Sequence, residues 1–185
     1  MTEAPAETIE RTFAIEIEAP IDKVWNEITK THSLQRAMFD TMLEAELRPG
    51  GRLRYRSSNG KRTFIFGEVI EAVSPTRFVH TFAFSNLEDA PTLVAWDLEP
   101  TASGGVRVTV THSRFIGETK TFKSVNTVWP QILGRIKALA EGRNLSVKDR
   151  MMFRMMGAMQ FMLPKSTLSA NVDQRASQYP SEVNS

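Results

Sequence analysis

Histidines and one carboxylate are the side chains of this chain that could carry acid and base chemistry. His32, His80 and His112 lie on different predicted elements, without the short spacing that a histidine metal site needs. His112 ends the run VRVTVTH on its apolar face, so it would point inward, as a ligand anchor, a proton carrier or a satisfied structural side chain. His80 has the same inward phase among phenylalanines. We predict no metal and no cofactor.

Glu68 is the carboxylate whose position favours the interior. It shares the strand phase of Phe64 and Phe66, so it would face the interior, where an acid or base acting on a ligand must lie. No second carboxylate is predicted to face it, so we expect no catalytic constellation. An enzyme of the cyclase or hydrolase type would have to use His112 or Glu68, and this remains an alternative.

The stretch MMFRMMGAMQFM, residues 151–162, holds six of the nine methionines. At helical spacing, Met152, Met155, Met156 and Met159 form one apolar stripe. A Cu(I) site would add His or Cys, which this stretch lacks, and the stretch is too short to cross a bilayer, although a helix lying in a membrane interface stays open. Because methionine is a flexible side chain, we predict packing, either against the body of the domain or against a second subunit or protein partner.

The pattern of apolar residues predicts one domain of mixed α and β structure. Residues 12–18 alternate as a half-buried strand, 21–29 read as an amphipathic helix, and 31–39 read as a second short helix or turn. Six antiparallel strand patterns follow, and residues 125–139 repeat at helical spacing before Gly142. Ser146 and Pro164 bound a further, Met-rich helix, and Pro130 should lie in the first turn of the preceding helix or kink it.

Composition excludes several classes of protein. A formal charge of +2 is too small for a nucleic-acid-binding face, and the absence of cysteine is compatible with a reducing cytoplasm, where we expect the protein. The acidic start of the sequence does not resemble a signal peptide, and we expect no stable membrane insertion. We predict a flexible N-terminus at residues 1–10, the main domain at 11–142, the Met-rich helix at 143–164 and a flexible tail at 165–185.

Five segments follow one another along the chain: APIDKVWNEIT, RPGGRLRYR, GEVIEAVSPTRFVHTFAF, VAWDLEPTASGGVRVTVTHSRF and WPQILGRIKALAEG. In order and spacing, these segments resemble one branch of the START-like SRPBCC superfamily. That branch is named after the activator of heat-shock protein 90 ATPase. The resemblance implies an α+β helix-grip fold, in which a curved antiparallel sheet of about seven strands wraps around a long C-terminal helix. Relatives include co-chaperone domains, lipid carriers and polyketide cyclases, so the fold implies no single activity.

The resemblance also implies an apolar cavity between sheet and helix that binds a small hydrophobic molecule. Strand phase and helix phase predict which side chains would line it, although the same residues would also suit a filled core. The predicted ligand-binding residues are Phe39, Phe64, Phe66, His80, Phe82, Phe84, Trp96, His112, Trp129 and Leu133. The family pattern ends near Gly142, so it is silent on the Met-rich helix.

Overall fold

A computed structural model describes residues 8–179 and 181 of the chain. Eight antiparallel strands form one curved sheet in the order β1-β8-β7-β6-β5-β4-β3-β2. Their bounds are β1 Ile9–Ile17, β2 Leu34–Gln35, β3 Thr41–Ala45, β4 Arg52–Arg56, β5 Thr63–Val73, β6 Arg77–Phe84, β7 Thr92–Pro100 and β8 Val106–Phe115. Most of the predicted N-terminal segment, residues 1–10, lies outside the described residues, but its last two residues already belong to β1.

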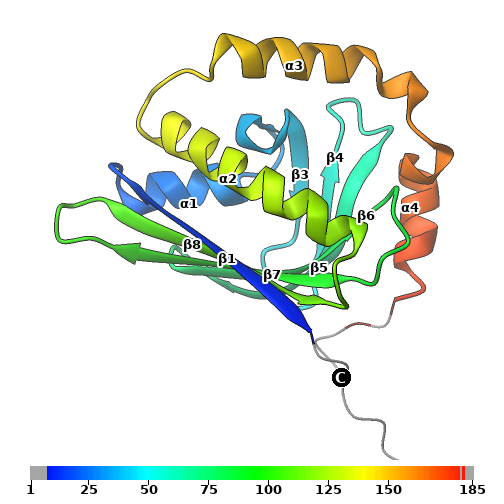
Figure 1. Ribbon diagram of the computed structural model, residues 1–185, viewed down its shortest axis with the longest axis horizontal. Coiled ribbons are helices and arrows are strands. Elements are labelled where there is room, and N and C mark those ends of the chain that lie inside the picture. Colours follow the sequence, from blue (N-terminus) through cyan, green and yellow to red (C-terminus); the bar gives the residue numbers. More distant parts are fainter. Residues whose placement is uncertain (1–7, 180, 182–185) are drawn as a thin grey trace, which may run out of the picture.

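One long helix lies across the concave face of the sheet (Figure 1). The helices are α1 Ile21–Thr29, α2 Lys120–Ala140, α3 Val147–Ala158 and α4 Ser169–Ala176, with short 3₁₀ turns η1 Arg36–Met38, η2 Gln160–Met162 and η3 Lys165–Thr167. The prediction of an α+β helix-grip fold is confirmed. The sheet has one strand more than the approximate seven that we expected, because β2 pairs with β3.

Burial alternates along β7 and β8 as their apolar residues do. In β8, Val106, Val108 and Val110 are buried and the residues between them are more exposed, so alternate side chains enter the core on the α2 side. Helix α2 buries Val125, Trp129 and other apolar residues against this face. Burial of this kind contributes roughly 25 cal/mol per Å² of apolar surface, and it holds the helix in the grip of the sheet.

The segment after α1 differs from the second short helix that we predicted. Leu34 and Gln35 form β2 and pair with β3, and only one 3₁₀ turn follows. The reason is the buried Gln35 side chain, whose amide group donates hydrogen bonds to the carbonyls of Ile28 and Lys30. These bonds tie the segment to the end of α1 in an extended form, which a helix would not allow.

The C-terminal segment also differs from the prediction, because residues 165–179 are not a flexible tail. Helix α4 packs on the outer face of the sheet, where Val172 is buried in a small cluster with Phe66. Asp173 accepts hydrogen bonds from Arg54 and Arg56, and Arg54 is nearly buried. Few apolar residues suffice for this contact because charged pairs supply the rest, and a reading based on hydropathy misses them.

No helix in the described part of the chain is both long enough and apolar enough to cross a bilayer. Pro130 lies inside α2 rather than in its first turn.

Candidate functional site

A cavity of about 720 Å³ lies between the concave face of the sheet, helix α2 and helix α3. Its volume falls within the range of small-molecule sites, roughly 300–1,000 Å³. The side chains around it are mainly apolar. Those of the sheet, the η1 segment and α2 include Met38, Phe39, Ile65, Phe64, Phe82, Phe84, Val125, Val128, Trp129 and Ile132.

Helix α2 presents one face to the cavity. Val125, Val128, Trp129 and Ile132 are three or four residues apart, so they fall on one side of the helix. Trp129 is 2% exposed, and its ring packs edge-on against Trp96 at 5.1 Å between ring centres. The cavity therefore has a rigid aromatic wall on this side.

Strands β5 and β6 form the opposite wall. Phe82 and Phe84 follow the alternation of β6 and lie edge to face, with ring centres 4.9 Å apart. Phe64 reaches the cavity through an irregularity, because the pairing of β4 and β5 shifts register between Tyr55 and Arg56. A bulge of this kind turns a side chain to the face of the sheet opposite to the one that regular alternation would give it.

His112 lies in a linear series of hydrogen bonds behind the cavity wall. The indole N–H of Trp129 donates to its Nδ1 at 3.0 Å, so the proton belongs on Nε2, which lies 2.7 Å from the hydroxyl of Thr92. Thr92 in turn donates to the carbonyl of Phe82. Burial, with a further contribution from the charge of His80, lowers the pKa of His112 to about 3.

Four of the predicted ligand-binding residues lie behind the cavity wall instead of on it. His80, Trp96, His112 and Leu133 are all buried in the core and are absent from the cavity lining. His80 has its Nδ1 2.8 Å from the carbonyl of Thr81, and burial lowers its pKa to about 4. Both inward histidines are thus neutral side chains with hydrogen-bond partners inside the fold.

The prediction that Phe66 and Glu68 point inward is wrong. In the antiparallel pairing of β4 and β5, Phe66 lies opposite Arg54 and Glu68 lies opposite Arg52. All four side chains line a separate depression on the outer face of the sheet, beside α4. The bulge that turns Phe64 inward leaves Phe66 and Glu68 on the opposite phase. Glu68 and His112 therefore lie on opposite faces of the sheet, and no shared site for acid and base chemistry forms.

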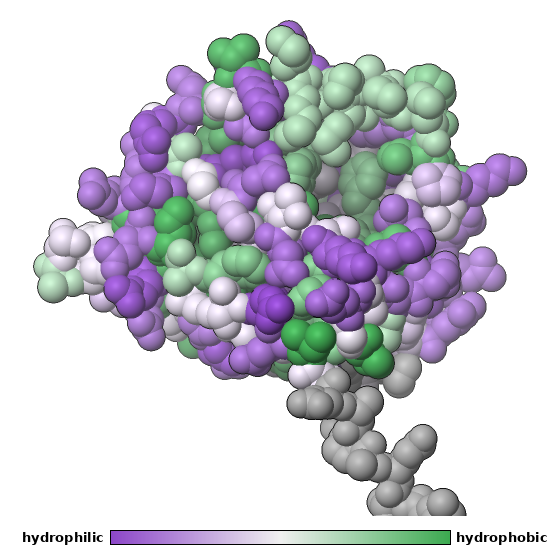
Figure 2. Space-filling view, in the orientation of Figure 1, coloured by the Kyte–Doolittle hydropathy of each residue, from purple (hydrophilic) through white to green (hydrophobic). Residues whose placement is uncertain are grey.

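The residues from Val147 to Leu163, which we call the lid, cover the cavity above α2. Met155, Met156 and Met159 line the cavity from the lid, whereas Met152 does not. Their outer surfaces stay open, because these three side chains are 45–58% exposed. Figure 2 shows pale green apolar side chains gathered along the top of the molecule, over α3, with a hollow beneath them.

Phe153 fastens the lid to the body, and it is the one buried residue of α3. The guanidinium group of Arg135, on α2, lies 4.6 Å from the ring centre of Phe39 and 5.0 Å from that of Phe153. The same guanidinium group donates to Asp149 at 2.9 Å. The Ser146 hydroxyl lowers the pKa of Asp149, with Arg135 adding to the effect.

Few polar atoms face the cavity, and one of them is unusual. Ser85, at the end of β6, is 1% exposed, and its hydroxyl has no hydrogen-bond partner among the described residues. An unpartnered buried hydroxyl costs about 1–3 kcal/mol, so a ligand acceptor or donor at this point would be favourable. Within the described residues, no three His, Asp or Glu side chains gather as a metal ligand set.

Several cavity residues escaped prediction, and the available signals differ. Val125 and Val128 were detectable, because they share the helical spacing of Trp129. Leu163 was detectable too, because it shares the helical spacing of Met155, Met156 and Met159. Ser85 had no signal in the sequence, since it follows the end of β6 and its direction depends on tertiary packing.

Comparison with solved structures supports the fold. CalU16 from Micromonospora echinospora matches with a TM-score of 0.60 at 18% identity, over 86% of this chain and 91% of its own. An HSP90 activator from Plasmodium falciparum matches with a TM-score of 0.59 at 19% identity, over 70% and 94%. The Aha1 dimer from Colwellia psychrerythraea gives 0.59 at 20%, over 72% and 96%.

The sequence comparisons identify the family but not an individual relative. No curated protein matches the chain at a significant level. The family model described as "Activator of Hsp90 ATPase homolog 1-like protein" matches residues 18–141, which is most of the chain from the end of β1 to the end of α2. The chain therefore belongs to the family of activator of Hsp90 ATPase homolog 1-like proteins.

Proposed function

We propose that this protein binds a small hydrophobic molecule in the cavity between its sheet, α2 and the lid. The observation that carries the proposal is the cavity itself, about 720 Å³ with a mainly apolar lining and a cover supplied by the same chain. A filled core would leave no such volume, because protein interiors pack as densely as organic crystals.

The lining favours a flexible apolar ligand with one polar group. Aromatic rings of β5, β6 and α2 form the fixed walls, while Met155, Met156 and Met159 form a side that adapts to shape. The Ser85 hydroxyl supplies a polar contact inside this apolar surface. Catalysis is not part of the proposal, because both inward histidines lie outside the cavity lining and have hydrogen-bond partners within the fold.

Blocking the cavity should abolish binding. We expect Val128→Trp, on the cavity face of α2, to lower the affinity for the neutral probe N-phenyl-1-naphthylamine at least about tenfold, because the added ring occupies ligand volume. Thr127→Trp, on the exposed side of the same helix, is the matched control and should bind as the unmodified protein does. Probe fluorescence in a titration measures both, and native mass spectrometry of the purified protein reports any ligand carried from the cell.

Equal probe affinity in both tryptophan variants and the unmodified chain would place the probe elsewhere and contradict the proposal. Circular dichroism of Val128→Trp shows whether the variant folds, so loss of binding is not confused with unfolding.

Association through the lid is a second candidate function. Met151, Phe161 and Met162 are 66–78% exposed, which is unusual for large apolar side chains on one short segment. The Colwellia protein is described as a dimer, which supports self-association as a proposal for this chain. We predict that Phe161→Gln with Met162→Gln lowers the sedimentation coefficient of the protein at high concentration. A chain that sediments as a monomer with and without these changes would remove this candidate.

A further inference from the structure

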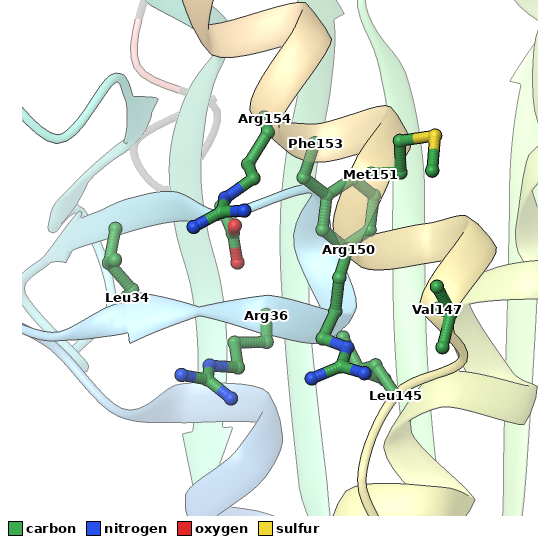
Figure 3. A pocket seen from close by; sticks show the side chains of 9 residues that line it. Leu34, Arg36, Leu145, Val147, Arg150, Met151, Phe153 and Arg154 are labelled. Carbon is green, nitrogen blue, oxygen red and sulfur yellow. The ribbon is translucent and has the colours of Figure 1, made fainter.

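A second pocket, of about 510 Å³, lies under the other side of the lid, where it meets the η1 segment. Its lining combines apolar side chains with three arginines, Arg36, Arg150 and Arg154, and one carboxylate, Asp40. Figure 3 shows Arg150 and Arg154 extending from α3 and Arg36 extending from the η1 segment, and all three line the same pocket.

The three arginines form no ion pair with any residue that the structure describes. Among the described residues, none of their guanidinium groups forms an ion pair or a hydrogen bond, and Arg36 acts on Asp40 only through its charge. Most other arginines of the chain do form ion pairs, as Arg54, Arg77 and Arg107 do. An excess of unpaired positive charge in a partly apolar pocket is a binding surface for an anion.

This pocket adjoins the apolar cavity of the proposed function. Leu34, Asp40 and Phe153 line both. Phe39 and Asp40 lie at the boundary between the two pockets, and both have uncommon positive φ angles, +58° and +54°. In this conformation the ring of Phe39 stacks against the guanidinium group of Arg135. Strained residues of this kind persist where the surrounding contacts impose them, and they concentrate at binding sites.

We propose that the ligand is an amphipathic anion, whose hydrocarbon part occupies the apolar cavity and whose carboxylate or phosphate group is bound by Arg36, Arg150 and Arg154. Guanidinium groups bind both kinds of oxyanion through paired hydrogen bonds. This inference rests on the proposed function and adds the chemical class of the ligand. Because two of the three arginines belong to the lid, an anionic head group would also hold the lid closed.

Asp40 sets the strength of this site. Burial raises the pKa of its carboxyl group, and the charge of Arg36 opposes that effect. The carboxylate repels a bound anion while it neutralises part of the arginine charge. Asp40→Asn keeps a residue that tolerates positive φ and removes the repulsion, so it should strengthen anion binding.

The test compares three ligands that share one hydrocarbon chain, dodecanoate, dodecyl phosphate and dodecanol, by displacement of N-phenyl-1-naphthylamine from the full-length protein. We expect at least one anion to bind about tenfold more tightly than the alcohol, because each exposed charge pair contributes modestly and three act together. Which anion is preferred distinguishes a carboxylate from a phosphate head group. Replacing Arg36, Arg150 and Arg154 by Gln should erase the preference and leave dodecanol binding unchanged.

A control variant with Arg48, Arg107 and Arg143 replaced by Gln removes the same formal charge at exposed positions outside both pockets, and it should keep the preference. The preference should shrink in high salt, as screening requires. Equal affinity for anion and alcohol, or a preference that survives in the pocket variant, would overturn the head-group inference alone. Absence of binding by the probe and all three ligands would overturn the proposed function with it.

Discussion

Arg135→Met should release the lid from the body of the protein. Arg135 is 6% exposed and joins α2 to α3 through Asp149 while its guanidinium group stacks on Phe39 and Phe153. Removing one partner of a buried pair costs roughly 3–5 kcal/mol, and the partial exposure of Asp149 reduces this to about 2 kcal/mol. Since the lid has one buried anchor, the loss should appear there first, as hydrogen exchange of the α3 amides about thirtyfold faster.

Arg143→Met serves as the control for this prediction. Arg143 follows the same helix and pairs with Glu141, but it is exposed and does not contact α3 residues Asp149 or Phe153. Its replacement should leave exchange of the α3 amides as it is. Unchanged protection of α3 in Arg135→Met would show that contacts other than those of Arg135 hold the lid over the cavity.

Acid should destabilise the protein well above the pH at which carboxylates titrate, because two histidines are buried in the neutral form. Burial lowers the pKa of His80 to about 4 and that of His112 to about 3, whereas both return to about 6.5 on unfolding. The unfolded state therefore binds more protons below pH 6.5. Stability is complete above that pH and is lost as the pH falls toward the folded values, at about 1.4 kcal/mol per pH unit for each histidine.

Urea unfolding between pH 7.5 and 4.5 measures this effect, which should reach about 5 kcal/mol at the lower limit. His80→Gln should remove about half of the pH dependence, although it also lowers stability at neutral pH. His32→Gln is the matched control, because His32 is exposed, and it should leave the slope unchanged. A free energy of unfolding that stays constant down to pH 5 would mean that the two histidines are not buried as described.

Much of the fold could be predicted from periodicity alone. Alternation in β1, β7 and β8 and the helical spacing of α2 are strong local signals, because these elements bury one regular face. The two parts that differ have no such face. The η1 segment is shaped by the hydrogen bonds of the Gln35 amide, and α4 is attached by ion pairs of Asp173. Both segments therefore depend on particular side-chain contacts, which the spacing of apolar residues does not reveal.

The candidate site was predictable where an element is regular and failed at irregularities. Phe82, Phe84 and Trp129 reach the cavity as their phase predicts. Phe66 and Glu68 do not, because a register shift in β5 cannot be read from residue types. His112 points inward as predicted but lies behind the cavity wall. The alternation of side chains along a strand predicts the face of the sheet on which a residue lies, but it does not predict whether that residue reaches the surface of a cavity.

The position of Trp129 gives this protein an optical property of practical use. Of the three tryptophans, Trp129 belongs to the cavity wall, whereas Trp25 and Trp96 are buried and do not line it. Its indole N–H is already bonded to His112, so an arriving molecule meets the ring and not the N–H group. Intrinsic ultraviolet emission should therefore change in intensity when the cavity fills, and unlabelled protein can be screened against ligands without an added dye.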